Sequence, residues 1–331
     1  MRPASVRRWV RQETAEAGAA ANPPKLVSAH DVESAAERIK PHIDHTKLVP
    51  VIGTDGIHAK LECDQPTNSF KIRGAINAVA VLAEEGAVRH IVVHSSGNYA
   101  RSIAHAARLY GIKVTAVLPD TAPPVKVDAV RRLGAEVLVV PPAQRESAAS
   151  DLCAESGGRL VPADEFAAIA GAGTVGLEIV HDLPETAAIL VPVCSGSQLA
   201  GISAVLKAEH PSVRVIGVEP ELAADGAESL RRGALTSWPV ELTYRTVADG
   251  LRAPSMGRLA WAHIRRFADD ILTVDEDAIV EASALLRTST GVTAEPSGAV
   301  GLAAWLRHRE TLPRGPVVAV VTGGNAAADP A

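Results

Sequence analysis

One lysine lies between two apolar side chains in the stretch TNSFKIRGA, residues 67 to 75. Phe70 precedes Lys71 and Ile72 follows it. An amine among apolar groups loses the solvation that favours its charged form, and a neutral amine can form a Schiff base with an aldehyde. The stretch therefore predicts a lysine that reacts covalently with a carbonyl compound. Taken alone, a lysine in such a stretch is more often a solvated or structural residue.

Other polar turns each follow an expected buried strand. They are Ser95 to Asn98, Cys194 to Ser197, Glu219, and Thr322 to Asn325. In α/β sheets, ligands bind beyond the carboxyl ends of parallel strands, so turns in this position converge on one edge. The sequence predicts that these four turns form a single site.

The elements that must position this site follow an α/β pattern from residue 90 onwards, in which runs of β-branched residues alternate with helix-like stretches. We expect strands at 90–96, 112–119, 135–142, 187–196, 213–220, 269–274 and 315–324, and helices at 102–111, 125–134, 277–289 and 298–309. The pattern predicts two lobes with parallel sheets. Residues 90–167 would form the small lobe, residues 28–89 and 168–331 the large one, and residues 1–27 a flexible arm.

Composition excludes several classes of function. A formal net charge of −5 and 3% aromatic residues argue against a nucleic-acid surface. No apolar run approaches the roughly 18 residues of a membrane span. The cysteines, Cys63, Cys153 and Cys194, are odd in number and far apart, which is typical of neither a disulfide framework nor a zinc cluster. We therefore expect a cytoplasmic protein with a small-molecule partner.

Two other motifs receive ordinary interpretations. The stretch GAGTVG (171 to 176) has the glycine spacing of a dinucleotide-binding loop, but no good strand precedes it, and we expect a structural turn before the next helix. The histidines of HIDH (42 to 45) lack further ligands nearby, and those of HIVVH (90 to 94) lie too far apart along a strand for one ion. We expect neither pair to bind a metal.

Six stretches together resemble a known family. They are TNSFKIRGAINAV, SSGNYARSIAHAARLYG, VEPELAADG, TVADGLRAP, TAEPSGAVGLAA and VVTGGN. Their order and spacing resemble those of the fold-type II pyridoxal-phosphate enzymes, and within that group the threonine/serine dehydratase and serine racemase family. The resemblance runs from about residue 28 to residue 326. It implies a tryptophan synthase β-like α/β fold with pyridoxal 5'-phosphate between the lobes, an amino-acid substrate and a homodimer.

The resemblance also assigns residue roles. Lys71 corresponds to the lysine that forms the Schiff base and moves protons on one face of the cofactor, and Ser96 to the hydroxyl on the opposite face. Asn98 corresponds to the partner of the cofactor's phenolic oxygen. The loop that would hold the substrate carboxylate consists of Ser95, Ser96, Gly97, Asn98 and Tyr99.

Further cofactor residues come from the second half of the chain. Thr322 corresponds to the hydroxyl that meets the cofactor's ring nitrogen, and Glu295 lies near the ring. The stretch that takes the place of the family's glycine-rich phosphate loop contains Cys194, Ser195, Gly196, Ser197 and Gln198. Only one of the family's usual glycines remains there. Asn68 and Tyr99 also depart from the family, replacing a glycine and a histidine.

A cation site is implied by the same resemblance. Glu219, Ala223 and Asp225 match positions at which serine racemase-like members bind a divalent cation through two carboxylates and a carbonyl. Such oxygen ligands suit Mg²⁺ or Ca²⁺. A solvated acidic turn is the alternative.

The function implied is a pyridoxal-phosphate ammonia-lyase, or dehydratase, that converts a β-hydroxy-α-amino acid such as serine, threonine or 3-hydroxyaspartate to a 2-oxo acid and ammonia. The departures around the site favour a larger or differently charged substrate than L-threonine. Two alternatives stay open. An amino-acid racemase or epimerase would share the removal of the Cα proton, and a non-catalytic binding protein could retain the fold.

Overall fold

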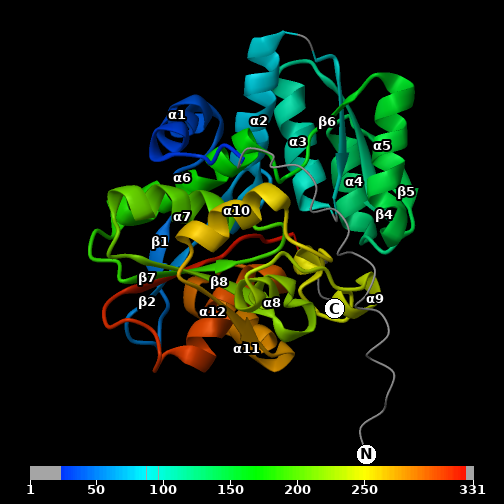
Figure 1. The fold of residues 1–331 in the computed structure, drawn as a ribbon. Coiled ribbons are helices and arrows are strands. Elements are labelled where there is room, and N and C mark those ends of the chain that lie inside the picture. The colour runs from blue at the N-terminus through cyan, green and yellow to red at the C-terminus, as the bar shows by residue number, and fades with distance from the viewer. Residues whose placement is uncertain (1–23, 87, 96, 326–331) are drawn as a thin grey trace, which may run out of the picture.

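A computed structural model describes residues 24–86, 88–95 and 97–325. Most of the expected N-terminal arm, residues 1–27, lies outside the described residues. Figure 1 shows a small sheet with its helices, coloured cyan to green, beside a larger body built from both ends of the chain. The α/β fold class expected from the alternating pattern is confirmed.

The large sheet has six strands in the order β1-β2-β10-β7-β8-β9. Their bounds are β1 Leu48–Pro50, β2 Ile57–Lys60, β7 Ala188–Pro192, β8 Arg214–Pro220, β9 Asp270–Val274 and β10 Val317–Val320. Neighbouring strands are parallel except for β1 and β2, whose antiparallel pairing the sequence pattern did not indicate. β7 is buried along its whole length, as a strand covered by helices on both faces must be.

The small sheet has four parallel strands in the order β5-β4-β3-β6. Their bounds are β3 His90–His94, β4 Lys113–Pro119, β5 Glu136–Val140 and β6 Arg159–Leu160. All four fall inside the expected small lobe of residues 90–167. The exact lobe boundaries stay a prediction.

Helices cover both sheets (Figure 1). Their bounds are α1 Ala29–Ile39, α2 Lys71–Glu85, α3 Asn98–Leu109, α4 Pro124–Arg132, α5 Arg145–Ser156, α6 Phe166–Asp182, α7 Ser197–Glu209, α8 Asp225–Arg232, α9 Val240–Thr243, α10 Arg258–Phe267, α11 Glu276–Thr290 and α12 Pro296–His308. Alternate β7 residues divide the core of the large lobe: Leu190 packs with residues of α11 and α12, whereas Ile189 packs with residues of α6, α7 and α10. Within the described residues, no helix is both long enough and apolar enough to cross a membrane.

The expected turn at GAGTVG is wrong, because residues 171 to 176 lie inside α6. The glycines serve close helix packing instead. A Cβ at Gly171 would lie 2.5 Å from the carbonyl oxygen of Arg73 on α2, and one at Gly173 would lie 2.8 Å from the carbonyl of Gly201 on α7. Helix α6 therefore holds α2, which begins at Lys71, against the rest of the large lobe.

Candidate active site

One cavity gathers all the residues that the resemblance assigns to the cofactor. It is lined by Lys71, Asn98, Cys194, Ser195, Gly196, Ser197, Gln198, Glu295 and Thr322, together with six neighbours. These residues come from the starts of α2 and α3, the turn between β7 and α7, the start of α12 and the end of β10. Three of the four expected turns therefore contribute to this cavity, through Asn98, Cys194 to Ser197 and Thr322, whereas the expectation for Glu219 is wrong because it does not line the cavity. Each residue's role stays a prediction.

The backbone before Lys71 is fastened to the turn after β10. Phe70 donates its backbone N–H to the carbonyl of Thr322 at 3.1 Å, and Ser69 forms an isolated antiparallel bridge with Gly323. Lys71 then begins α2, with its side chain half-buried and lining the cavity. Its amine is thus partly accessible, not fully enclosed as the apolar neighbours suggested, because Ile72 packs into the core on another side of the helix.

The backbone conformation at Asn68 explains why an asparagine can stand where the family has a glycine. Its φ of 52° places it in the left-handed region, and among the described residues no other non-glycine residue has a positive φ. Asparagine tolerates this region better than most side chains because its short polar group bonds locally. Its carbonyl also accepts the N–H of Gly324 at 3.0 Å. Asparagine can therefore replace the usual glycine without changing the loop.

The turn from Cys194 to Ser197 keeps its glycine where the backbone requires it. Gly196 has a φ of 84°, and a Cβ there would lie 2.9 Å from Cδ1 of Ile264. Cys194, Ser195 and Ser197 have no positive φ, so their side chains impose no backbone strain. Replacement of the other family glycines is therefore compatible with the turn.

Gln198 offers a test of whether this turn suits a phosphate. Its side chain is 2% exposed, and neither its amide oxygen nor its amide nitrogen has a hydrogen-bond partner. Ser197 and Gln198 also begin α7, where the backbone N–H groups have no partner within the helix. Unpaired buried donors at a helix start favour an anion. The residues present therefore fit the phosphate group of pyridoxal phosphate.

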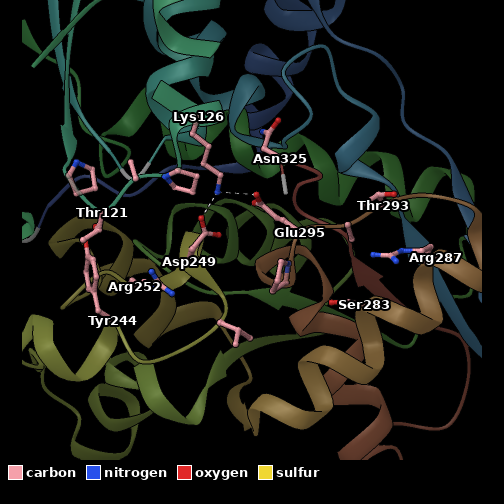
Figure 2. A pocket seen from close by; sticks show the side chains of 16 residues that line it. Thr121, Lys126, Tyr244, Asp249, Arg252, Ser283, Arg287, Thr293, Glu295 and Asn325 are labelled. Atoms are coloured by element: carbon pink, nitrogen blue, oxygen red, sulfur yellow. Dashed lines mark hydrogen bonds and ion pairs between the residues drawn. The ribbon is translucent and has the colours of Figure 1, made fainter. Parts of the chain in front are cut away.

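A charged cluster that includes Glu295 joins the small lobe to the large one, and Figure 2 shows its side chains, Lys126, Asp249 and Glu295, in a neighbouring pocket. Asn98 donates to Oε1 of Glu295 at 2.6 Å, and Oε2 of Glu295 lies 3.3 Å from Nζ of Lys126, an ion pair too poorly aligned for a hydrogen bond. Lys126 on α4 also pairs with Asp249 at 2.5 Å. Burial lowers the pKa of Lys126, but the two carboxylates outweigh burial and raise it, so this amine stays protonated.

Sequence reasoning missed the part played by Lys126. The stretch VKVDAVRRLG indicated only a helix, and nothing in it marks one lysine for burial. Asp249 lies within TVADGLRAP and carried a weak signal as part of a family motif. The pairing depends on two lobes meeting, across 123 positions of the chain, which local patterns do not report.

The loop expected to bind the substrate carboxylate packs against Lys126. Gly97 has a φ of 143°, and a Cβ there would lie 3.0 Å from Cδ of Lys126. Ser95 accepts the N–H of Gly97 at 3.0 Å. Tyr99 is buried and donates its hydroxyl to the carbonyl of Pro162 at 3.2 Å, and burial raises its pKa well above the usual value. Ser96 lies outside the described residues.

A larger hollow of about 560 Å³ opens beside the cavity. Lys71, Cys194 and Ser195 line both spaces, so the lysine lies at their junction. The walls of the hollow include Ser95 and Tyr99 from the expected substrate loop. They also include Arg145 and Arg252, two cationic side chains that the sequence analysis did not single out. The larger hollow is therefore the space in which a substrate could reach Lys71.

The expected cation-binding residues form a buried acidic pair. Glu219 is 1% exposed and accepts the N–H groups of Gly226 at 3.0 Å and Ala227 at 2.8 Å, while Asp225 is 2% exposed and accepts the N–H of Met256 at 2.9 Å. Neither carboxylate has an ion-pair partner within the described ranges. Burial, with the charge of Asp225, raises the pKa of Glu219 well above its usual value.

Burial likewise raises the pKa of Asp225 to about 7. The alternative of a solvated acidic turn is wrong, because both carboxylates are enclosed. Ala223, the third expected ligand residue, is buried close to them in sequence. An oxygen-only donor set with uncompensated charge fits a divalent cation.

Comparison with known proteins agrees with this geometry. Residues 34–323 match the family model described as pyridoxal-phosphate dependent enzyme. A serine racemase from Oryza sativa subsp. indica is 39% identical over 285 residues, covering 84% of this chain and 83% of the relative. An L-threonine ammonia-lyase from Geobacter sulfurreducens is 36% identical over 303 residues, covering 89% and 74%. The structure of maize serine racemase superposes with a TM-score of 0.85 at 34% identity, covering 92% of this chain and 95% of that one.

Proposed function

Because the chain belongs to the family of pyridoxal-phosphate dependent enzymes, we propose that it is an ammonia-lyase that converts a β-hydroxy-α-amino acid to a 2-oxo acid and ammonia. One observation carries this proposal. Lys71 lies at the junction between the cavity whose residues suit the cofactor's phosphate and the larger hollow that could admit a substrate. Relatives named for lyase activity support the same reaction class.

Bound pyridoxal phosphate would supply an aldehyde that links to amines and a conjugated ring that withdraws electrons from Cα. The amides of Ser197 and Gln198 would hold its phosphate, and Asn98 would orient its ring. Lys71 would accept the proton from Cα of the substrate. The β-hydroxyl then leaves as water, and hydrolysis of the remaining enamine gives the 2-oxo acid and ammonia.

Thr322 supports elimination over slower chemistry. A hydroxyl group beside the cofactor's ring nitrogen need not keep that nitrogen protonated, so charge at Cα would be less strongly stabilised. Reactions that expel a β-substituent promptly suit such a ring. Thr322 is 5% exposed, and its own hydroxyl lies 3.4 Å from the carbonyl of Ser297, so water competes little for it.

Racemisation is the second candidate, favoured by the 39% identity to serine racemases. It shares the removal of the Cα proton by Lys71 and then needs a donor on the opposite face. Ser96 is the residue proposed for that step. A non-catalytic protein is less well supported, since Lys71, Asn98 and Thr322 line one cavity.

The substrate is proposed to carry a charged or larger β-substituent. The hollow beside Lys71 is lined by arginines (Arg145, Arg252 and Arg258) and by carboxylates (Glu146, Asp164 and Asp249), and a second carboxylate, as in 3-hydroxyaspartate, would pair with the arginines. We further propose that Glu219 and Asp225, with the carbonyl of Ala223, bind Mg²⁺ or Ca²⁺. The homodimer and the cytoplasmic location stay predictions from the resemblance.

Attachment of the cofactor to Lys71 tests the site directly. Borohydride reduction of the protein with bound pyridoxal phosphate should fix the label on the peptide that contains Lys71, detected by mass spectrometry. Lys71→Ala should lose the label and the turnover, whereas Lys47→Ala, which removes an exposed lysine, should lose neither. A label retained at another lysine in Lys71→Ala with full turnover would contradict the assignment.

A further inference from the structure

Three metal-binding side chains converge on the surface, away from the cofactor cavity. His45 lies in the segment before β1, and His181 and Asp182 end α6. Nε2 of His45 is 2.9 Å from both carboxylate oxygens of Asp182, and Nδ1 of His181 is 3.2 Å from Oδ1. The three ligand atoms lie within 4.8 Å of one another. The sequence analysis set His45 aside because its partners come from 136 and 137 positions later in the chain.

These side chains are open to solution. The side chain of His45 is 54% exposed, that of His181 80% and that of Asp182 21%. The two imidazole rings meet edge to face, with centroids 6.0 Å apart, so they do not stack. An ion can therefore approach from solvent without unpacking the core.

The carboxylate of Asp182 also contacts a buried cation. Its Oδ2 accepts Nζ of Lys60 at 3.2 Å, and Lys60 is fully buried, where it also donates to the carbonyl of Thr46 at 2.7 Å and pairs with Glu178 at 2.8 Å. Lys60 thus fixes the carboxylate and leaves Oδ1 facing the histidines. An outer partner of this kind orients a metal ligand before the metal binds.

The donor set selects the class of ion. Two imidazole nitrogens and one carboxylate oxygen suit Zn²⁺, whereas Mg²⁺ and Ca²⁺ prefer oxygen ligands throughout. Zn–N and Zn–O bonds of roughly 2.0–2.2 Å place tetrahedral ligand atoms about 3.3 Å apart. The nitrogen-to-oxygen separations of 2.9 and 3.2 Å need only slight widening to reach this spacing, and the two imidazole nitrogens, which lie within 4.8 Å of each other, must adopt it when the ion binds.

We propose that His45, His181 and Asp182 bind a zinc ion on the surface of the large lobe, with water completing the coordination. The ion fastens the segment before β1 to the end of α6. It is separate from the oxygen-only pair of Glu219 and Asp225. Because the ion binds the folded arrangement of two distant segments, it raises the stability of the protein.

Calorimetric titration of the cofactor-loaded protein with zinc tests this site. Excess Mg²⁺ in the buffer keeps the oxygen-only site occupied. We expect one zinc ion per chain, and at least about tenfold weaker binding in both His45→Ala and His181→Ala. His30→Ala, which removes an exposed histidine elsewhere, should leave the affinity unchanged.

Two further readouts keep the proposal open to contradiction. Zinc should raise the melting temperature of the natural protein but not that of the His45→Ala, His181→Ala double variant, in which both substituted side chains are more than half exposed and lie outside the packed core. Cobalt(II) should give the visible absorption of a tetrahedral site that the double variant lacks. Absence of zinc binding, or unchanged affinity in the double variant, would overturn the proposal.

Discussion

Two groups of carboxylates in the large lobe, each wholly or partly buried, have opposite electrostatic environments. Glu62 and Glu178 surround Arg73, which is fully buried and pairs with both, at 2.7 Å in each case. Glu219 and Asp225 are both buried, and the hydrogen bonds that their carboxylates accept come from backbone N–H groups. We refer to these groups as the paired cluster and the unpaired cluster.

The difference shows in the direction of the pKa changes. Burial raises the pKa of Glu178, but hydrogen bonds and charges from Arg73 and Lys60 outweigh it and hold that pKa below its usual value. In the unpaired cluster burial dominates, and the pKa of Asp225 rises to about 7. Burial alone therefore does not decide ionisation, and a carboxylate pair without a cation is the one suited to recruit a metal ion.

Removing the cation of the paired cluster should have the largest effect. Arg73→Met would leave Glu62 buried without its ion-pair partner and Glu178 with Lys60 alone, and we expect the free energy of unfolding to fall by about 3–5 kcal/mol in urea denaturation. Adding Glu62→Gln and Glu178→Gln to that variant should restore part of the loss. A loss below about 1 kcal/mol would mean that the paired cluster contributes little.

Neutralising the unpaired cluster should act in the opposite direction. Asp225→Asn keeps an acceptor for the N–H of Met256 and removes a buried charge, so the free energy of unfolding at pH 8 without divalent cations should rise by roughly 1–3 kcal/mol. The same substitution should abolish the thermal stabilisation by Ca²⁺ or Mg²⁺ that we expect in the natural protein. Destabilisation under chelating conditions would contradict an uncompensated charge at this position.

The two clusters should also respond to pH in opposite directions. Glu178 has a lowered pKa in the folded protein, so its contribution to the free energy of unfolding is present above pH 4.5 and is lost as the pH falls further. Asp225 has a raised pKa, so its contribution is present below pH 3.8 and is lost as the pH rises to about 7. With chelator present, the urea midpoint of Asp225→Asn should exceed that of the natural protein by an amount that grows between pH 4 and pH 7 and then levels off.

Breaking an exposed ion pair should have the smallest effect on stability. Arg307 pairs with Asp275 at 3.1 Å and with Glu281 at 2.9 Å, and all three side chains are at least one-third exposed. Arg307→Ala should lower the free energy of unfolding much less than Arg73→Met does, because solvent and salt screen such pairs. A loss as large as that of Arg73→Met would mean that burial does not distinguish the two arginines.

Much of the fold could be predicted because strands and helices leave local periodic patterns. The run from Arg214 to Pro220 and the helix closed by Gly291 lie where β-branched runs and helix signals indicated them. The antiparallel pair β1 and β2 was missed because its strands are short and its register follows from a neighbour, β10, more than 250 positions later. The helix at GAGTVG was missed because close packing, not turn formation, explains its glycines.

The grouping of the expected cofactor residues could be predicted because the order of the motifs indicated it, and the structure places these residues in one cavity, while their roles stay a prediction. The ion-pair partners could not be predicted from the sequence. Lys126 meets Glu295, and His45 meets Asp182, only through tertiary packing, and the two members of each pair do not lie in one sequence motif. Asn68 was noted as a departure, but its left-handed φ, which accounts for the residue type, is visible only in the folded backbone.

Proton NMR in heavy water tests the central claim most directly. The cofactor-loaded protein with Mg²⁺ would receive L-serine, L-threonine and threo-3-hydroxyaspartate together. We predict that a 2-oxo acid forms, fastest from 3-hydroxyaspartate, and that Lys71→Ala forms none. Loss of the Cα proton signal without any 2-oxo acid would contradict the lyase assignment and favour racemisation, and an unchanged mixture would contradict catalysis on all three amino acids.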